Sequence, residues 1–127
     1  MCIRDSCLIT QKFSVERHAE LALSSDSKII GLKVDTIANL GAYSLVLAAV
    51  TPTYLYAPLI LGIYDIPTAC CTVKGVYTNT APTDAYRGAG RPEATYVIER
   101  IVTEAAKEIG MDQAAVSYTH LTLPTKA

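Results

Sequence analysis

The sequence predicts an α+β fold in which antiparallel strands precede a C-terminal amphipathic helix. Residues 18–24 and 28–36 alternate between apolar and polar side chains, and residues 25–27 between them have turn chemistry. Residues 68–77 are rich in β-branched side chains, which are typical of a strand. In residues 92–109 apolar side chains recur every three or four positions, which is the helical period. We therefore expect a hairpin, a further strand and a helix, in that order.

The composition indicates a piece of a larger protein. Half of the 127 residues are hydrophobic and only 18% are charged, whereas globular domains average about 25% charged residues. Such a chain should bury more surface than it can cover alone. The formal net charge of −1 provides no basic field, so we expect no nucleic-acid partner.

The two ends differ from the middle of the chain. Residues 1–7 lack the apolar run of a signal peptide, and residues 116–127 have no helical period of their own. Both segments resemble translated sequencing-adapter sequence. We therefore expect residues 8–115 to be the native part and exclude His120 as a ligand. A natural frayed terminus is the alternative.

The strand pattern extends over residues 13–43 and predicts an antiparallel hairpin with one buried face. Residues 39–43 should break it as a loop or a bulge. His18 is expected to be a half-exposed strand residue and not a ligand, because no second candidate ligand lies nearby.

No charged side chain occurs between Asp35 and Asp65, a run long enough to span a membrane. Prolines, a glycine and the lack of a flanking basic cluster argue against a membrane span. We expect an interior segment that is partly helical around Ala48 and over residues 56–61. Its tyrosines should need partners for their hydroxyl groups, namely Tyr54, Tyr56 and Tyr64.

The four cysteines predict no metal site within this chain. None belongs to a C-x-x-C pair, and only two histidines are present. Cys70 and Cys71 should be reduced residues of a packed strand. A disulfide between them is the alternative, although neighbouring residues meet disulfide geometry poorly.

Residues 92–109 form the strongest helical pattern. One face is apolar, Arg100 precedes Glu104 by four positions, and Gly110 follows as a helix stop. No side chain of this helix has a catalytic pattern, so we assign no catalytic residue. The buried face should comprise Ala94, Val97, Ile98, Ile101, Val102, Ala105 and Ile109.

The segment from Arg87 to Arg91 leads directly into this helix and contains two glycines between two arginines. A flexible loop at a helix N-terminus can bind an anion, and guanidinium groups favour such binding. The segment is neither a Walker loop nor a dinucleotide fingerprint. From the pattern alone, three interpretations stay open: an anion- or nucleotide-binding module without redox activity, a cofactor loop, or a tight connection that binds nothing.

A resemblance to a known family narrows this choice. Residues 64–67 (Tyr-Asp-Ile-Pro), Thr78-Asn79 and residues 84–94 (Asp-Ala-Tyr-Arg-Gly-Ala-Gly-Arg-Pro-Glu-Ala) resemble the molybdopterin-binding large subunit of the xanthine dehydrogenase family. The similarity is greatest to the branch labelled aerobic carbon monoxide dehydrogenase large subunit, form II. It covers residues 18–112, a minority of such a subunit, so the implied fold is part of a molybdopterin-binding domain.

The resemblance implies an oxidoreductase that hydroxylates a small molecule at a molybdenum cofactor, expected in its cytosine dinucleotide form. Arg87, Gly88, Ala89 and Gly90 are the implied cofactor-binding residues. Electrons would pass to Fe-S and FAD subunits of a dimerised heterotrimer in the cytoplasm. The general base of the family lies outside this chain, so the chain alone should be inactive.

Two departures from the family pattern bear on the substrate. Gly88 stands where carbon monoxide oxidisers have a copper-binding cysteine. Ala89 stands where purine-oxidising members have an aromatic ring. We therefore expect an aldehyde or an aromatic N-heterocycle as substrate.

Overall fold

The protein is described by a computed structural model, which covers the backbone of residues 2–10 and 14–120 and the side chains of residues 16–116. Its elements follow one another as β1 (Cys2–Thr10), β2 (Ser14–Leu23), β3 (Ile29–Gly41), the 3-10 helix η1 (Ala57–Leu59), β4 (Ala69–Tyr77), α1 (Arg91–Ile109) and α2 (Gln113–His120).

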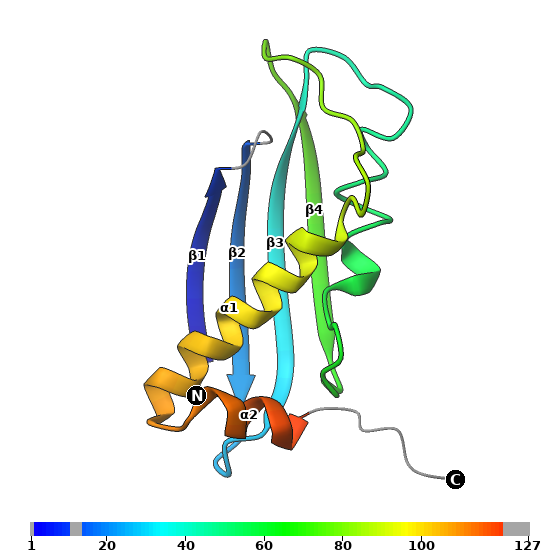
Figure 1. The fold of residues 1–127 in the computed structure, drawn as a ribbon. Helices are drawn as coiled ribbons and strands as arrows, with labels where there is room; N and C mark the ends of the chain where they lie inside the picture. The colour runs from blue at the N-terminus through cyan, green and yellow to red at the C-terminus, as the bar shows by residue number, and fades with distance from the viewer. Residues whose placement is uncertain (1, 11–13, 121–127) are drawn as a thin grey trace, which may run out of the picture.

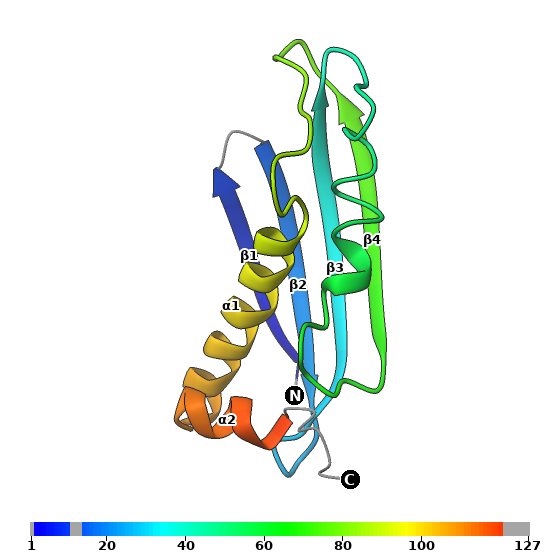
Figure 2. The same cartoon turned by 45° about the vertical axis from the view of Figure 1, so that its right-hand side comes forward.

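The strands form one sheet in the order β1-β2-β3-β4, and α1 crosses one face of it (Figures 1 and 2). β1 and β2 pair antiparallel, as do β2 and β3, whereas β3 and β4 pair parallel. The α+β class is confirmed. The sheet is mixed because residues 42–68 return the chain to the starting end of β3, as a parallel pair requires.

The predicted hairpin is confirmed. Ser24 N–H donates to the Lys28 carbonyl at 2.8 Å and closes the turn between β2 and β3. One face is buried, and the opposite face carries charged pairs such as Lys33–Asp35 at 3.2 Å. His18 lies half-exposed on that second face, 3.3 Å from Glu20, as expected.

The predicted break after residue 39 is a bulge. The pairing of β3 with β4 shifts between Asn39 and Gly41. Gly41 has φ +78°, and a Cβ there would lie 2.4 Å from Pro82 Cα. Only glycine allows the chain to pass so close to the segment that follows β4.

The core lies between the sheet and α1. The predicted apolar face of α1 is buried, except that Ile109 is partly buried. Gly110 ends the helix in the left-handed conformation, and Arg100 pairs with Glu104 at 3.2 Å. Both features were predicted.

Residues 42–68, the crossover segment that connects β3 to β4, belong to this core only in part. Tyr56, Ile60 and Tyr64 are buried in it, on the same side of the sheet as α1. The predicted helices around Ala48 and over residues 56–61 are turns and the short η1, because the prolines interrupt longer helices. Among the residues that the structure describes, no helix has the length and hydropathy needed to cross a membrane.

The two ends carry more structure than the sequence pattern suggests. α2 includes residues 116–120, for which no helix was expected, and Val116 is buried against the core. Tertiary contact of this kind stabilises a short helix that lacks its own period. β1 includes most of residues 1–7. Neither element tests whether these segments are native, and that assignment stays a prediction.

Cys70 and Cys71 lie on β4 as free thiols, which agrees with the prediction that they are reduced. Cys71 is partly buried. Cys70, however, is exposed, because β4 is an edge strand of the sheet and little packs on it. The side chains of Cys2 and Cys7 are outside the described residues.

Candidate functional site

Residues 78–90 connect β4 to α1 (Figure 1), and the loop from Thr83 to Gly90 is the last part of this connection. Gly88 and Gly90 have φ of +84° and +85°, so the predicted need for glycine is confirmed at both positions. A Cβ on Gly90 would lie 2.3 Å from the Leu55 carbonyl oxygen, whereas a Cβ on Gly88 would meet nothing within 4 Å. Gly90 therefore permits a close approach to the crossover segment, and Gly88 leaves space open.

The loop also leaves backbone donors free. Ala89 N–H donates to the Tyr86 carbonyl at 2.9 Å and Arg91 N–H to the Gly88 carbonyl at 3.0 Å. Within the described part of the chain, the N–H groups of Gly88 and Gly90 donate no hydrogen bond. Gly90 is also the N-cap of α1, where no side chain caps the helix. Free N–H groups at a helix N-terminus favour a hydrogen-bond acceptor or an anion.

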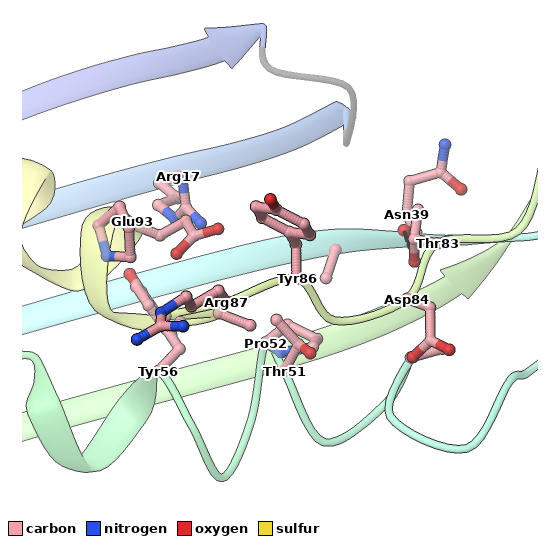
Figure 3. Close-up of a pocket in the computed structure, with 16 residues that line it drawn as sticks. Arg17, Asn39, Thr51, Pro52, Tyr56, Thr83, Asp84, Tyr86, Arg87 and Glu93 are labelled. Carbon is pink, nitrogen blue, oxygen red and sulfur yellow. Dashed lines mark hydrogen bonds between the residues drawn. The ribbon is translucent and has the colours of Figure 1, made fainter.

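A cavity of about 620 Å³ opens beside this loop (Figure 3). Its wall combines the loop, the crossover segment, β2, β3 and the first turn of α1. All four predicted cofactor-binding residues line it, whereas Arg91 is exposed and does not. The lining residues that matter most here are Arg17, Asn39, Tyr56, Asp84, Arg87, Gly88, Ala89, Gly90 and Glu93.

Arg17 is a cavity residue that the sequence interpretation missed. It lies on β2, is only 3% exposed, and places its guanidinium 4.9 Å from the centre of the Tyr56 ring. Its Nε and Nη1 atoms are buried and have no hydrogen-bond partner among the described residues. A signal was present, because Arg17 is in phase with the buried Ala19 and Leu21 of the same strand.

Glu93 is the second residue that was not assigned to the site. It stands in the first turn of α1 and lines the same cavity. Its Oε2 atom is buried and, like the two nitrogen atoms of Arg17, has no hydrogen-bond partner among the described residues. Buried polar atoms without partners are rare in proteins and call for an explanation.

Tyr56 forms part of the wall between these groups. The Thr36 hydroxyl donates to the Tyr56 oxygen at 3.4 Å, and burial raises the pKa of Tyr56. The phenol is therefore neutral at physiological pH and adds no counter-charge for Arg17. The expected partner of Tyr64 is also present, since its hydroxyl donates to Glu99 at 3.0 Å. Tyr54, in contrast, is 77% exposed.

Asn39 also lines the cavity, and its side chain forms three hydrogen bonds. Its side-chain oxygen accepts hydrogen bonds from Gly41 N–H and the Thr78 hydroxyl, both at 2.8 Å. Its amide nitrogen donates to the Thr80 hydroxyl at 3.1 Å. This network holds the segment after β4 against the bulge in β3, and it thereby sets the path of the loop into the cavity.

The charged groups on the wall are two arginines, Arg17 and Arg87, and two acids, Asp84 and Glu93. The arginines are hydrogen-bond donors and the acids are acceptors, and their formal charges balance. No cluster of histidine, cysteine or acidic residues in the described part of the chain could hold a metal ion directly. The wall therefore offers both hydrogen-bond donors and acceptors to a bound molecule.

Comparison with known proteins agrees with this geometry. The family model described as "Molybdopterin cofactor-binding domain" matches residues 4–120. The carbon monoxide dehydrogenase large chain of Hydrogenophaga pseudoflava is 45% identical over 114 residues, which are 84% of this chain and 14% of that protein. The 6-hydroxypseudooxynicotine dehydrogenase complex subunit gamma of Paenarthrobacter nicotinovorans is 37% identical over 74% of this chain and 12% of that protein.

Solved structures show the same fold. Quinoline 2-oxidoreductase from Pseudomonas putida 86 superposes with a TM-score of 0.80 at 25% identity, over 87% of this chain and 14% of that chain. The Cu,Mo-CO dehydrogenase superposes with a TM-score of 0.74 at 31% identity, over the same shares of the two chains. The chain thus spans about one seventh of the length of these relatives. The resemblance to the xanthine dehydrogenase family and its carbon monoxide dehydrogenase branch is confirmed, and this chain belongs to the molybdopterin cofactor-binding domain family.

Proposed function

We propose that this chain is the part of a molybdenum hydroxylase large subunit that contacts the molybdopterin cofactor through Arg87, Gly88, Ala89 and Gly90. One observation carries the proposal. These four residues line one cavity at a helix N-terminus, where two of their N–H groups have no partner among the described residues.

The residues present fit such a cofactor. A group rich in oxygen and sulfur acceptors needs N–H and guanidinium donors. The loop supplies both, through the N–H groups of Gly88 and Gly90 and the exposed Arg87 side chain. At Gly90 the loop lies directly against the backbone of Leu55, which leaves no room for a Cβ. The bound cofactor would supply the redox chemistry, and the protein groups would bind and orient it.

The identity of the substrate follows from what the loop lacks. Gly88 has no thiol with which to hold copper, so carbon monoxide is disfavoured, and Ala89 has no ring to flank a purine. The open space at Gly88 leaves room for a larger molecule. We favour an aldehyde or an aromatic N-heterocycle, and relatives named for nicotine-derived and quinoline substrates support the second class.

The remaining parts of the proposal concern the whole protein. The cofactor is proposed in its cytosine dinucleotide form, and Fe-S and FAD subunits would complete a dimerised heterotrimer. Relatives named as a large chain and as a complex subunit support such an assembly. The cytoplasmic location stays a prediction from the sequence.

The test compares two arginines that differ in position. In the complete subunit with its partner subunits, Arg87→Ala should lower the molybdenum content or the turnover by about tenfold or more, since it removes hydrogen bonds from a charged donor. Arg91→Ala should change neither, because Arg91 is exposed outside the cavity. Metal analysis and steady-state kinetics give the two readouts.

Unchanged molybdenum content and kinetics in Arg87→Ala would contradict the proposal that Arg87 contacts the cofactor. A wild-type protein that contains neither molybdenum nor pterin would instead support the other interpretation, a stand-alone module that binds anions or nucleotides without redox activity.

A further inference from the structure

Arg17 and Glu93 both line the cavity, and each has buried polar atoms without a hydrogen-bond partner among the described residues. Arg17 offers two buried N–H donors and Glu93 one buried oxygen acceptor. The two come from different elements, since Arg17 lies on β2 and Glu93 on α1, and α1 packs against β2. In Figure 3 both side chains are drawn at the same end of the cavity.

The burial of Arg17 requires a partner that the described residues do not provide. Arg17 is only 3% exposed, so its guanidinium loses hydration, and the lack of partners for Nε and Nη1 makes that loss costly. The Tyr56 ring at 4.9 Å compensates part of the charge but cannot accept these two hydrogen bonds. The missing partner must therefore bring an acceptor to Arg17.

Glu93 restricts what this partner can be. A free anion at Arg17 would also face the unpartnered oxygen of Glu93, and the two negative charges would repel each other. A neutral group with a carbonyl oxygen beside an N–H satisfies both residues at once. The guanidinium donates to the carbonyl, and the carboxylate accepts from the N–H.

We infer that Arg17 and Glu93 form a binding site for the lactam edge of a neutral heterocycle. This inference rests on the proposed function, because it takes the cavity to be the cofactor and substrate site. Lactam chemistry can come from two sources: the pterin ring of the cofactor and the ring of a heterocyclic substrate. Both hydrogen bonds are charge-assisted, so a ligand without the edge leaves buried polar atoms of both residues without partners and is strongly rejected.

The experiment uses the complete subunit with its partners and two probes, 2-pyridone and N-methyl-2-pyridone. Both probes have the carbonyl acceptor, but only the first has the N–H donor. The variants are Arg17→Met and Glu93→Met. Their controls are Arg91→Met and Glu108→Met, which change exposed residues outside the cavity. Dissociation constants, pterin and molybdenum content, and melting temperature are measured for each.

If the substrate supplies the edge, the wild type binds 2-pyridone at least about tenfold more tightly than the methylated probe. In Glu93→Met the two probes bind with equal affinity, and in Arg17→Met the affinity for both probes falls by a similar factor. If the cofactor supplies the edge, both variants lower the pterin content about tenfold or more. The two probes then bind the wild type and both variants with similar affinity. The controls match the wild type in either case.

Two results would overturn the inference. One is an unchanged pterin content together with equal affinities for the two probes in the wild type. The other is a fall in melting temperature alone, which would mean that the rest of the subunit satisfies the pair with its own backbone. Absence of molybdenum and pterin from the wild type would count against the proposed function only, since the probe measurements still report on Arg17 and Glu93.

Discussion

The two glycines of the loop before α1, Gly88 and Gly90, have the same backbone conformation and different surroundings. Both have a φ near +85°, which a residue with a side chain adopts at a cost. At Gly88 this is the whole cost of a substitution. At Gly90 a new Cβ would also collide with the backbone of Leu55, which cannot move aside as a flexible side chain would.

This difference predicts unequal effects of one substitution. Gly88→Ala should destabilise the folded protein by about 1–2 kcal/mol. Gly90→Ala should cost clearly more and also lower the cofactor content, because it displaces the loop from the crossover segment. Melting temperatures and molybdenum analysis of the complete subunit provide the comparison. Equal losses in the two variants would contradict the role assigned to the Gly90–Leu55 contact.

The residues of the site were predictable only where they are adjacent in sequence. Arg87, Gly88, Ala89 and Gly90 form one motif, and the resemblance pointed to it directly. Arg17 is distant from this motif in sequence and meets the loop only after β2, the crossover segment and α1 have packed together. The only clue to it in the sequence is an arginine in phase with buried strand residues.

At the scale of elements, α1 was the most predictable part of the chain. Its apolar pattern is long, and Gly110 marks its end. Both signals lie within the helical segment itself and do not depend on what packs against it. The direction of β4 was not predictable in this way. Alternation of side chains is the same in parallel and antiparallel strands, so only the path of residues 42–68 decides the pairing.

The packing of α1 leads to a matched pair of substitutions. Ile101→Ala removes a side chain that is 1% exposed and should lower the free energy of unfolding by about 2–5 kcal/mol. Glu108→Ala, on the exposed side of the same helix, should change it by less than about 0.5 kcal/mol. Urea denaturation followed by circular dichroism measures both. A loss below about 1 kcal/mol for Ile101→Ala would show that the helix is not part of the core described above.

At the scale of the whole molecule, the composition predicts that the chain cannot cover all of its apolar surface by itself. Large apolar side chains are exposed on the crossover segment and the loop, including Val46 at 89% and Tyr86 at 88%. β4 adds an edge with unpaired backbone groups and an exposed Tyr77. Extended apolar patches and open strand edges favour association with other chains.

The isolated 127-residue chain should therefore self-associate and bind a hydrophobic dye. Light scattering after size-exclusion chromatography and the fluorescence of 8-anilinonaphthalene-1-sulfonate test this expectation. The complete subunit serves as the control and should bind much less dye per residue, because its additional segments would cover these surfaces. A monomeric chain without dye binding would argue against the view that these surfaces are normally covered.

The parallel pairing of β3 and β4 has a consequence for the order of folding. β2 and β3 meet through a tight turn, whereas β4 can join the sheet only after residues 42–68 have closed a long loop. Closing a longer loop costs more chain entropy, so the hairpin should form before the β3–β4 pair. The bulge network at Asn39 and the path of residues 83–90 depend on that later pair. The loop before α1 should thus be among the last parts of the chain to acquire its shape, and the cofactor contact proposed for it would become possible only after the sheet is complete.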